Sequence, residues 1–368
     1  DDRNYLLGGT LSTRVYLKQE HAFLSHTLEG HLEPLFSVLS CLGRPYPEDF
    51  LRYLWKSLLL NSPHDSICGC SIDEVHEEMM IRYRKMRDVT GKLLQPSFAF
   101  QNLTSTSYGD TLVIFNPHPY PFSGYLEGDL YLQRKKIREV DFEVSKIREF
   151  PPEAEDFLPG IALISSGETV VPEILAQEEV ALFETPAHTL PEVFQAKRYR
   201  VGFVVCNLPP LGFRLYRVEV SHRRETVKPP EVFLLENEFY RVEVGPQGTL
   251  TIMEKETQMV FPIGPVFEDG SDAGDEYDYS PCLEDMVVTT ESLVPEISWV
   301  RYTPSVQRIR IAYAMNLPRG LTEDRKRRQS ERIPCPLILE VQLTSGMKRL
   351  DFRVYFENRV LEHRLQVV

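Results

Sequence analysis

The sequence lacks two features that would place it in a specialised class of protein. It has no run of about 18 consecutive apolar residues, so we expect no transmembrane helix. It has no basic excess, because 54 acidic side chains against 41 lysines and arginines give a formal net charge of −13. Nucleic-acid binding needs a clustered positive surface, so we expect no nucleic-acid partner. What remains is a globular protein with an ordinary apolar fraction of 42%.

Cysteine is also scarce. Six cysteines in 368 residues are too few for a disulfide scaffold and are typical of a reducing compartment, so we expect a cytoplasmic protein. Residues 1–5 show neither the charged-then-apolar order of a signal peptide nor an initiator methionine. We therefore expect the chain to begin inside a longer protein. Composition leaves open whether it forms a homo-oligomer.

Helical periodicity is confined to the first hundred residues. Leucines at spacings of seven and four predict a helix that begins near Ser12 or Thr13 and that Pro34 kinks or divides. A second helix opens at Pro47. The predicted apolar positions are Leu17, Leu24, Leu28, Leu35 and Leu39 in the first helix, Leu51, Leu54, Trp55, Leu58 and Leu59 in the second, and Val75, Met79, Tyr83, Met86 and Leu93 in the third.

The third helix is predicted to start at a capping box formed by Ser71 and Glu74. After about residue 100 the pattern becomes period-two alternation punctuated by proline and glycine, which indicates antiparallel sheet. We therefore predict an α+β multidomain protein, with an antiparallel three-helix bundle followed by β-sandwich domains. The predicted domains are residues 1–100, 101–225 and 226–368, the last of them incomplete.

The densest chemistry lies between the second and third predicted helices, in residues 61–70. His64 and Asp65 are adjacent, Cys68 and Cys70 follow within six residues, and His76 lies twelve residues after His64. A link between helices does not need such side chains for its own geometry. We therefore expect function in this loop.

The residues alone leave three interpretations of the loop open. In the first, His64 and Asp65 are turn and capping residues without further function. In the second, His64, Cys68, Cys70 and His76 bind a local zinc ion, although the Cys-x-Cys spacing is tighter than usual. In the third, His64 and Asp65 project into a site shared with another part of the protein.

Residues 62–76, Ser-Pro-His-Asp-Ser-Ile-Cys-Gly-Cys-Ser-Ile-Asp-Glu-Val-His, resemble the helix-loop-helix signature of glycoside hydrolase family 38, the α-mannosidases. Residues 11–19 are similar to the start of that family's middle three-helix domain. Residues 274–281 and 358–365 resemble its β-sandwich region, so the resemblance spans the whole chain. The cysteine-bearing loop is similar to the bacterial branch, which includes enzymes that hydrolyse mannosylglycerate.

The resemblance implies a catalytic zinc ion held partly by a loop histidine, which corresponds to His64. Its other ligands would be a histidine and an aspartate of an N-terminal β/α domain and the nucleophilic aspartate. Asp65 would contact sugar hydroxyls, and Tyr277 would be the sugar-facing tyrosine from the β region. Pro63 stands where the family often has another histidine. A retaining glycosidase needs two carboxyl groups roughly 5 Å apart, and we assign neither of those roles to Asp65.

The sequence shows neither the family's His-x-Asp zinc motif nor its nucleophile segment. We therefore predict that this chain contains no catalytic residue and is inactive alone. The parent would hydrolyse terminal α-mannosyl residues of small saccharides, with the α-mannoside and the N-terminal catalytic domain as partners. One alternative is a mannosylglycerate hydrolase. A second alternative, from another class, is a non-catalytic carbohydrate-binding or scaffolding module.

Two charged clusters carry weaker signals. The first is an acidic cluster within residues 269–278. It does not have EF-hand spacing, so we expect a solvated loop beside the sugar site rather than a calcium site. The basic run at residues 325–328 could bind an anion such as a substrate carboxylate, although a run of this length is typically a solvated loop. The acidic cluster consists of Asp269, Asp272, Asp275, Glu276 and Asp278.

Overall fold

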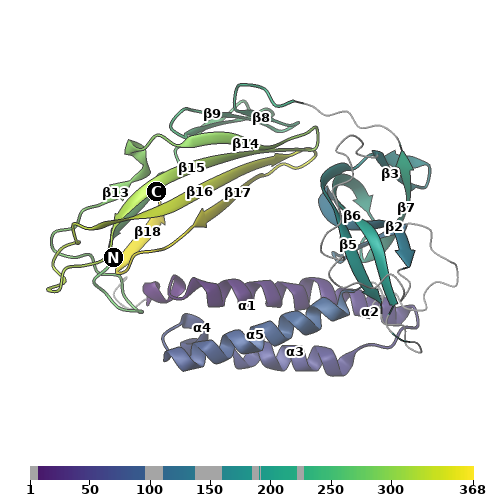
Figure 1. Cartoon of the computed structure of the whole chain (residues 1–368), viewed down its shortest axis with the longest axis horizontal. Coiled ribbons are helices and arrows are strands. Elements are labelled where there is room, and N and C mark those ends of the chain that lie inside the picture. The colour runs from purple at the N-terminus through teal and green to yellow at the C-terminus, as the bar shows by residue number, and fades with distance from the viewer. Residues whose placement is uncertain (1–6, 96–110, 137–159, 185–189, 191, 222–227) are drawn as a thin grey trace.

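The computed structural model describes residues 7–95, 111–136, 160–184, 190, 192–221 and 228–368. It contains a helical unit (7–95), a first β unit (111–221) and a second β unit (228–368), which confirms the α+β class. In Figure 1 the helices lie along one side of the second β unit, and the first β unit stands near the end of α2. Both predicted domain boundaries, after residues 100 and 225, fall outside the described residues.

Leucine periodicity builds the helical unit. Its elements are η2 (Gly8–Leu11, a 3-10 turn), α1 (Val15–Thr27), η3 (Leu28–Leu32, a π-helical turn), α2 (Glu33–Cys41), α3 (Glu48–Leu60), α4 (His64–Cys68) and α5 (Asp73–Leu93). All five leucines predicted for the first helix are buried in one core shared by α1, α2, α3 and α5. Leu59 contradicts its prediction and is 63% exposed. It follows Leu58, which faces the core, and successive helical residues are rotated by about 100°.

The break predicted at Pro34 is confirmed. The π-helical turn η3 separates α1 from α2 immediately before this proline, which stands in the first turn of α2. Proline has no amide hydrogen with which to continue the helical ladder. A π-helical turn is a common form of interruption within a longer helix.

The first helix begins slightly later than predicted, and the predicted capping box is wrong. The helix α1 begins at Val15 and follows Arg14, whose φ of 45° lies in the left-handed region. The Thr13 hydroxyl instead donates to the carbonyls of Gly9 at 3.0 Å and Glu276 at 3.1 Å. The helix α5 begins at Asp73 without a side-chain cap hydrogen bond.

The first β unit consists of two antiparallel sheets that share one core. Their strand orders are β1-β7-β3-β4 and β2-β6-β5. The strands are β1 (Thr111–Asn116), β2 (Phe122–Lys136), β3 (Gly160–Ser165), β4 (Glu168–Val170), β5 (Glu173–Glu184), β6 (Glu192–Leu208) and β7 (Gly212–Ser221). Buried side chains of both sheets, among them Leu163, Val201 and Phe203, form the core.

The second β unit contains three antiparallel sheets around a larger core. Their orders are β11-β10-β9-β8, β13-β12-β18 and β14-β15-β16-β17. The elements are β8 (Leu234–Glu236), β9 (Tyr240–Val244), β10 (Leu250–Glu254), β11 (Val260–Ile263), β12 (Phe267–Ser271), β13 (Val288–Thr289), η6 (Thr290–Ser292), β14 (Glu296–Tyr302), β15 (Val306–Pro318), β16 (Arg332–Thr344), β17 (Leu350–Phe356) and β18 (His363–Val367). Buried residues pair across the central strands, for example Ile309 with Val341.

The three units contact one another through a few side chains. Phe115 and Phe213 of the first β unit pack against the helical core, with ring centroids 4.8 Å apart. Arg301 of β14 donates to the Tyr125 hydroxyl at 3.0 Å and to the Glu127 carboxylate at 2.9 Å, which joins the two β units. Among the residues described, no helix has the length and apolar character needed to cross a bilayer.

Candidate functional site

The loop at residues 61–72 has a defined shape because its ends are fixed. Buried Asn61 donates through its side-chain amide to the Met79 carbonyl at 3.1 Å and accepts from Arg82 at 3.0 Å, which ties the loop to α5. Pro63 is extended, with φ −51° and ψ 144°, and α4 starts after it. Gly69 ends α4 with φ 83°, a conformation that favours glycine.

Two cations at the start of α1 hold the far side of the loop. Arg14 donates to the Gly69 carbonyl and forms an ion pair with Asp73 at 2.6 Å. The Lys18 ammonium donates to the Cys68 carbonyl at 3.2 Å. Burial is the first cause that lowers the pKa of Lys18, and the neighbouring Cys68 and Cys70 act in the opposite direction. The loop backbone is therefore braced on α1 as well as on α5.

His64 and Asp65 project from this braced backbone into open space. The His64 side chain is 90% exposed and the Asp65 side chain 61% exposed. Their nearest side-chain atoms, Nε2 and Oδ1, are 3.4 Å apart. Both side chains are thus available to a group that approaches from outside the described residues.

Tyr277 comes from the second β unit and lies beside the same loop. The pKa of Tyr277 is raised, first by the neighbouring Cys70 and further by Asp65. The Cys70 thiol also donates towards the Asp65 Oδ1 at 3.6 Å. The structure therefore brings Asp65, Cys70 and Tyr277 together, although Tyr277 is more than 200 positions away in the sequence.

Backbone contacts fix Tyr277 in this position. The Gly9 amide donates to the Tyr277 carbonyl at 2.8 Å, and the Thr13 hydroxyl reaches the carbonyl of the preceding Glu276. Sequence reasoning missed both Gly9 and Thr13. The only sequence signal was the Gly8-Gly9 pair, which is typical of close backbone approach but does not identify the partner.

The local zinc site is not formed. His76 is buried, and its Nε2 donates to the Ser71 carbonyl at 3.0 Å rather than facing His64 or the cysteines. Burial is the first cause that lowers the pKa of His76, followed by the charge of Arg14. Within the described ranges no group of three or more His, Cys, Asp or Glu side chains is placed to hold a metal ion.

The acidic cluster is partly structural, which corrects the expectation of a solvated loop. Asp269 is fully buried and pairs with Arg328. The Asp272 carboxylate accepts the Gly274 and Ser280 amides at 2.9 and 3.1 Å. Asp275 accepts the Tyr277 and Asp278 amides, and these bonds hold its pKa below the ordinary value. These carboxylates shape the chain around Tyr277.

The basic run is also partly structural. Arg328 is buried, with a side chain only 1% exposed, whereas a solvated loop was predicted. The Arg325 guanidinium pairs with Glu362 and donates to the Ala273 carbonyl at 3.1 Å. An anion-binding role is not supported for these two arginines, because protein acceptors already occupy them.

Comparison with known proteins gives concordant results. Residues 6–100 match a family described as the alpha mannosidase middle domain. A protein named "Putative mannosylglycerate hydrolase" from Halalkalibacterium halodurans is 25% identical over 98% of this chain and 43% of its own length.

Two solved structures from Enterococcus faecalis are also similar. An alpha-mannosidase of strain V583 superposes with a TM-score of 0.87 and 27% identity, over 98% of this chain and 43% of that protein. A protein in glycosyl hydrolase family 38 gives a TM-score of 0.84 and 28% identity, over 98% and 45%. The chain thus spans less than half the length of these relatives.

Proposed function

Because residues 6–100 are an α-mannosidase middle domain and the chain is homologous to family 38 glycosidases, we propose that it is part of a zinc-dependent retaining α-mannosidase. In this proposal the helical unit is the three-helix bundle and the β units are β-sandwich domains. An N-terminal β/α domain would supply the nucleophile and the proton donor. The substrate would be a terminal α-mannosyl residue of a small saccharide, in the bacterial cytoplasm.

One observation carries the proposal: His64 and Asp65 are exposed on a braced loop, and the segment that carries Tyr277 docks from the second β unit onto Gly9 and Thr13, just before the helix that braces this loop. Exposed polar side chains on a rigid backbone are the usual elements of a site shared between domains. The clustering supports a polar surface that is completed by another part of the protein.

The donor set fits a zinc ion that is held mainly by other residues. A neutral imidazole nitrogen is a standard zinc ligand, and the His64 ring is open to an approaching group. When bound, zinc would hold two adjacent sugar hydroxyls and favour distortion of the ring towards an oxocarbenium-like state. His64 would supply one ligand of that site.

The other residues would orient the sugar. The Asp65 carboxylate can accept a hydroxyl hydrogen, and the Tyr277 phenol can donate or accept one. Their positions are fixed by the loop and by the Gly9 contact, so the sugar would meet preorganised groups. We assign neither residue to nucleophilic attack or to proton transfer.

A second candidate function is hydrolysis of mannosylglycerate. The name of the Halalkalibacterium halodurans relative favours it, and that relative aligns with 98% of this chain. Comparing mannosylglycerate with mannobiose as substrates of the full-length protein would separate the two functions.

The test of the proposed function uses the full-length protein with its upstream sequence. We expect about one zinc ion per chain and hydrolysis of an aryl α-mannoside. H64A should weaken zinc binding by about 100-fold or more, because even outer-shell changes cost roughly 10–100-fold. H26A, which removes another exposed histidine of the helical unit, is the matched control and should retain zinc and activity.

Two results would contradict these assignments. Retention of zinc by H64A would overturn the assigned ligand. Glycan binding by the full-length protein without zinc and without hydrolysis would support the non-catalytic carbohydrate-binding module instead.

A further inference from the structure

The segment between β12 and β13 bridges the second β unit and the helical unit. We call residues 272–286 the bridging loop. It carries Tyr277, whose carbonyl accepts the Gly9 amide. Turns within the loop are fixed by the Asp272 and Asp275 carboxylates, which accept backbone amides. The position of Tyr277 then depends on how the two ends of the bridging loop are held.

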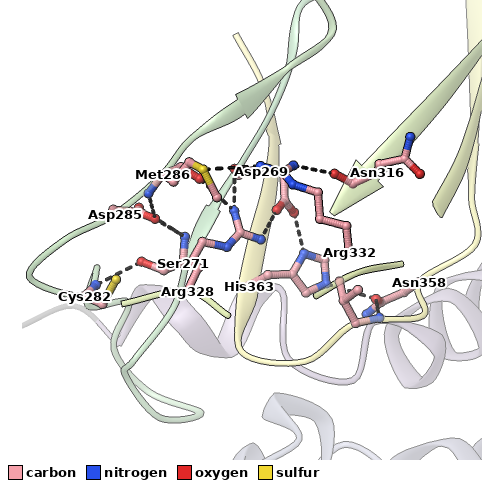
Figure 2. Close-up of polar contacts among 11 residues, drawn as sticks. Asp269, Ser271, Cys282, Asp285, Met286, Asn316, Arg328, Arg332, Asn358 and His363 are labelled. Atoms are coloured by element: carbon pink, nitrogen blue, oxygen red, sulfur yellow. Dashed lines mark hydrogen bonds and ion pairs between the residues drawn. The ribbon is translucent and has the colours of Figure 1, made fainter. Parts of the chain in front are cut away.

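One buried side chain contacts both ends of the bridging loop. The Arg328 Nη1 donates to the Asp269 carbonyl, shortly before the loop, at 2.9 Å, and to the carbonyl of Met286, its last residue, at 3.1 Å. The Nη2 of the same guanidinium pairs with the Asp269 carboxylate. Figure 2 shows the guanidinium between these two residues. Only arginine presents several donors in a planar fork that can make all these contacts.

A second group fixes the Asp269 carboxylate from its other side. The His363 Nδ1 lies 2.5 Å from the Asp269 Oδ2, and its Nε2 lies 3.0 Å from the Asn358 Oδ1. Asn358 is held in turn by the Val360 amide, which donates to the same oxygen at 3.0 Å. Both carboxylate oxygens of Asp269 are therefore engaged, as a buried charge requires.

The ends of the bridging loop are also joined directly. The Asp285 carboxylate accepts the Ser271 amide at 3.0 and 3.1 Å, and the Ser271 hydroxyl accepts the Cys282 amide at 2.9 Å. These contacts appear in Figure 2 beside Arg328. These contacts close the base of the bridging loop, and Tyr277 takes part in none of them.

We propose that Arg328 is a positioning residue that closes the base of the bridging loop and so holds Tyr277 docked on Gly9, beside the loop at residues 61–72, in the sugar site. That the site binds a sugar rests on the proposed function, whereas the positioning of Tyr277 does not. Arg328 touches no residue of the 61–72 loop in the contacts described, so it acts through the bridging loop. Loss of the fork should release Tyr277 without dismantling the core.

The experiment uses the full-length protein and three local probes. Exchange of the Gly9 amide reports docking of Tyr277, since that amide donates to the Tyr277 carbonyl. Alkylation of Cys282, which is 7% exposed and lies in the bridging loop, reports opening of its base. Alkylation of Cys335, which is fully buried in β16, reports global unfolding.

R328K is the decisive variant, because lysine keeps the charge beside Asp269 but lacks the fork. We expect Gly9 exchange and Cys282 alkylation to become about tenfold faster, with Cys335 unchanged, because a local opening responds to the loss of local hydrogen bonds. R319M is the control: Arg319 is exposed and its side chain pairs with Glu331. It should change none of the three rates.

Three results would overturn the proposal. Faster Cys282 alkylation with unchanged Gly9 exchange would mean that the base opens without moving Tyr277. Unchanged rates at both probes would mean that the fork is dispensable. Faster Cys335 alkylation in R328K would assign Arg328 to the global fold instead.

Enzyme activity, measured with and without the Tyr277 side chain, distinguishes a positioning role of Arg328 from a purely structural one. In the full-length protein we expect R328K to lower kcat/KM for an aryl α-mannoside by about 10- to 100-fold, the scale of a misplaced binding group. In a Y277A background the same substitution should have little further effect, because both changes remove one contact. Full additivity would contradict positioning through Tyr277. An inactive wild type would reject the proposed function, and the Gly9 result would still decide the role of Arg328.

Discussion

At the scale of single residues, close backbone approach is the feature that joins the helical unit to the bridging loop. A Cβ added at Gly9 would lie 2.8 Å from the Tyr277 carbonyl oxygen and 2.9 Å from its carbon. A Cβ added at Gly8 would have nothing within 4 Å. Adjacent glycines in one turn therefore differ completely in what they tolerate.

We predict that G9A destabilises the protein by about 1–3 kcal/mol, the usual cost of forcing extra volume into a tight contact. G8A should stay within about 0.5 kcal/mol of the wild type, as surface substitutions do. Urea unfolding of G9A and G8A measures the difference in their free energies of unfolding. The entropy change of the unfolded chain on replacing glycine with alanine is common to both variants and cancels in this difference. Equal stability of the two variants would show that the Gly9 contact is loose.

The site was partly predictable at this scale. His64 and Asp65 could be chosen from the loop because reactive side chains are out of place in a plain helix link. Tyr277 could be chosen only by resemblance, since no local pattern links it to residue 65. The prediction that Arg328 and Asp269 lie in solvated loops is wrong. A run of charges in the sequence is typical of a solvated loop, and the sequence does not show that these two side chains pair with each other in the interior.

At the scale of elements, the helix α3 shows what periodicity does and does not determine. Leu54 is fully buried in the helical core, whereas Leu59 is 63% exposed. Both fall in the apolar group predicted for this helix. The pattern identifies the helix and its general inner face, but the last turn lies at the edge of the packed region.

We predict that L54A lowers the free energy of unfolding by about 2–5 kcal/mol through lost burial and a residual cavity. L59A should change it by less than about 0.5 kcal/mol. Chemical denaturation followed by far-ultraviolet circular dichroism would measure both. A large effect of L59A would instead indicate that this leucine is covered by another surface in the native protein.

Element types were predicted better than element ends. Period-two alternation correctly indicated antiparallel sheet after residue 100, as in β7, where Tyr216 and Val218 are buried on one face. The helix start predicted near Ser12 or Thr13 falls short of α1, because the Thr13 hydroxyl binds the distant Glu276 carbonyl instead, and the capping box predicted at Ser71 is not formed. Local sequence does not encode such long-range competition.

At the scale of the whole molecule, the two β units are joined by an ion pair between Glu127 and Arg301. Burial acts to raise the pKa of Glu127, but hydrogen bonds and charge from Arg301, and then from Arg200, outweigh it and lower the pKa. A lowered pKa means that the stabilisation is present above the ordinary value of 4.5 and is lost as the pH falls through the lowered value.

We predict that E127Q is less stable than the wild type at pH 7 by at most about 1 kcal/mol, the range of solvent-accessible ion pairs. The difference should shrink as the pH falls below 4.5, because the unfolded-state carboxyl is protonated first and the folded one follows once the pH passes its lowered pKa. E219Q is the control, since Glu219 pairs with Arg217 inside the single strand β7. Thermal unfolding from pH 3 to 7 tests this; a gap that widens in acid would contradict it.

The residues that hold the bridging loop are far apart in the sequence. This separation determines the order in which they are synthesised. Gly9 leaves the ribosome early, whereas Arg328 and His363 emerge near the end of the described chain. At about 5–20 residues per second, the completed helical unit would wait roughly 15–55 s before Tyr277 could be locked in place. During translation the loop at residues 61–72 is therefore complete before its neighbour Tyr277 is anchored, and Cys70 stands without that neighbour until β18 is made.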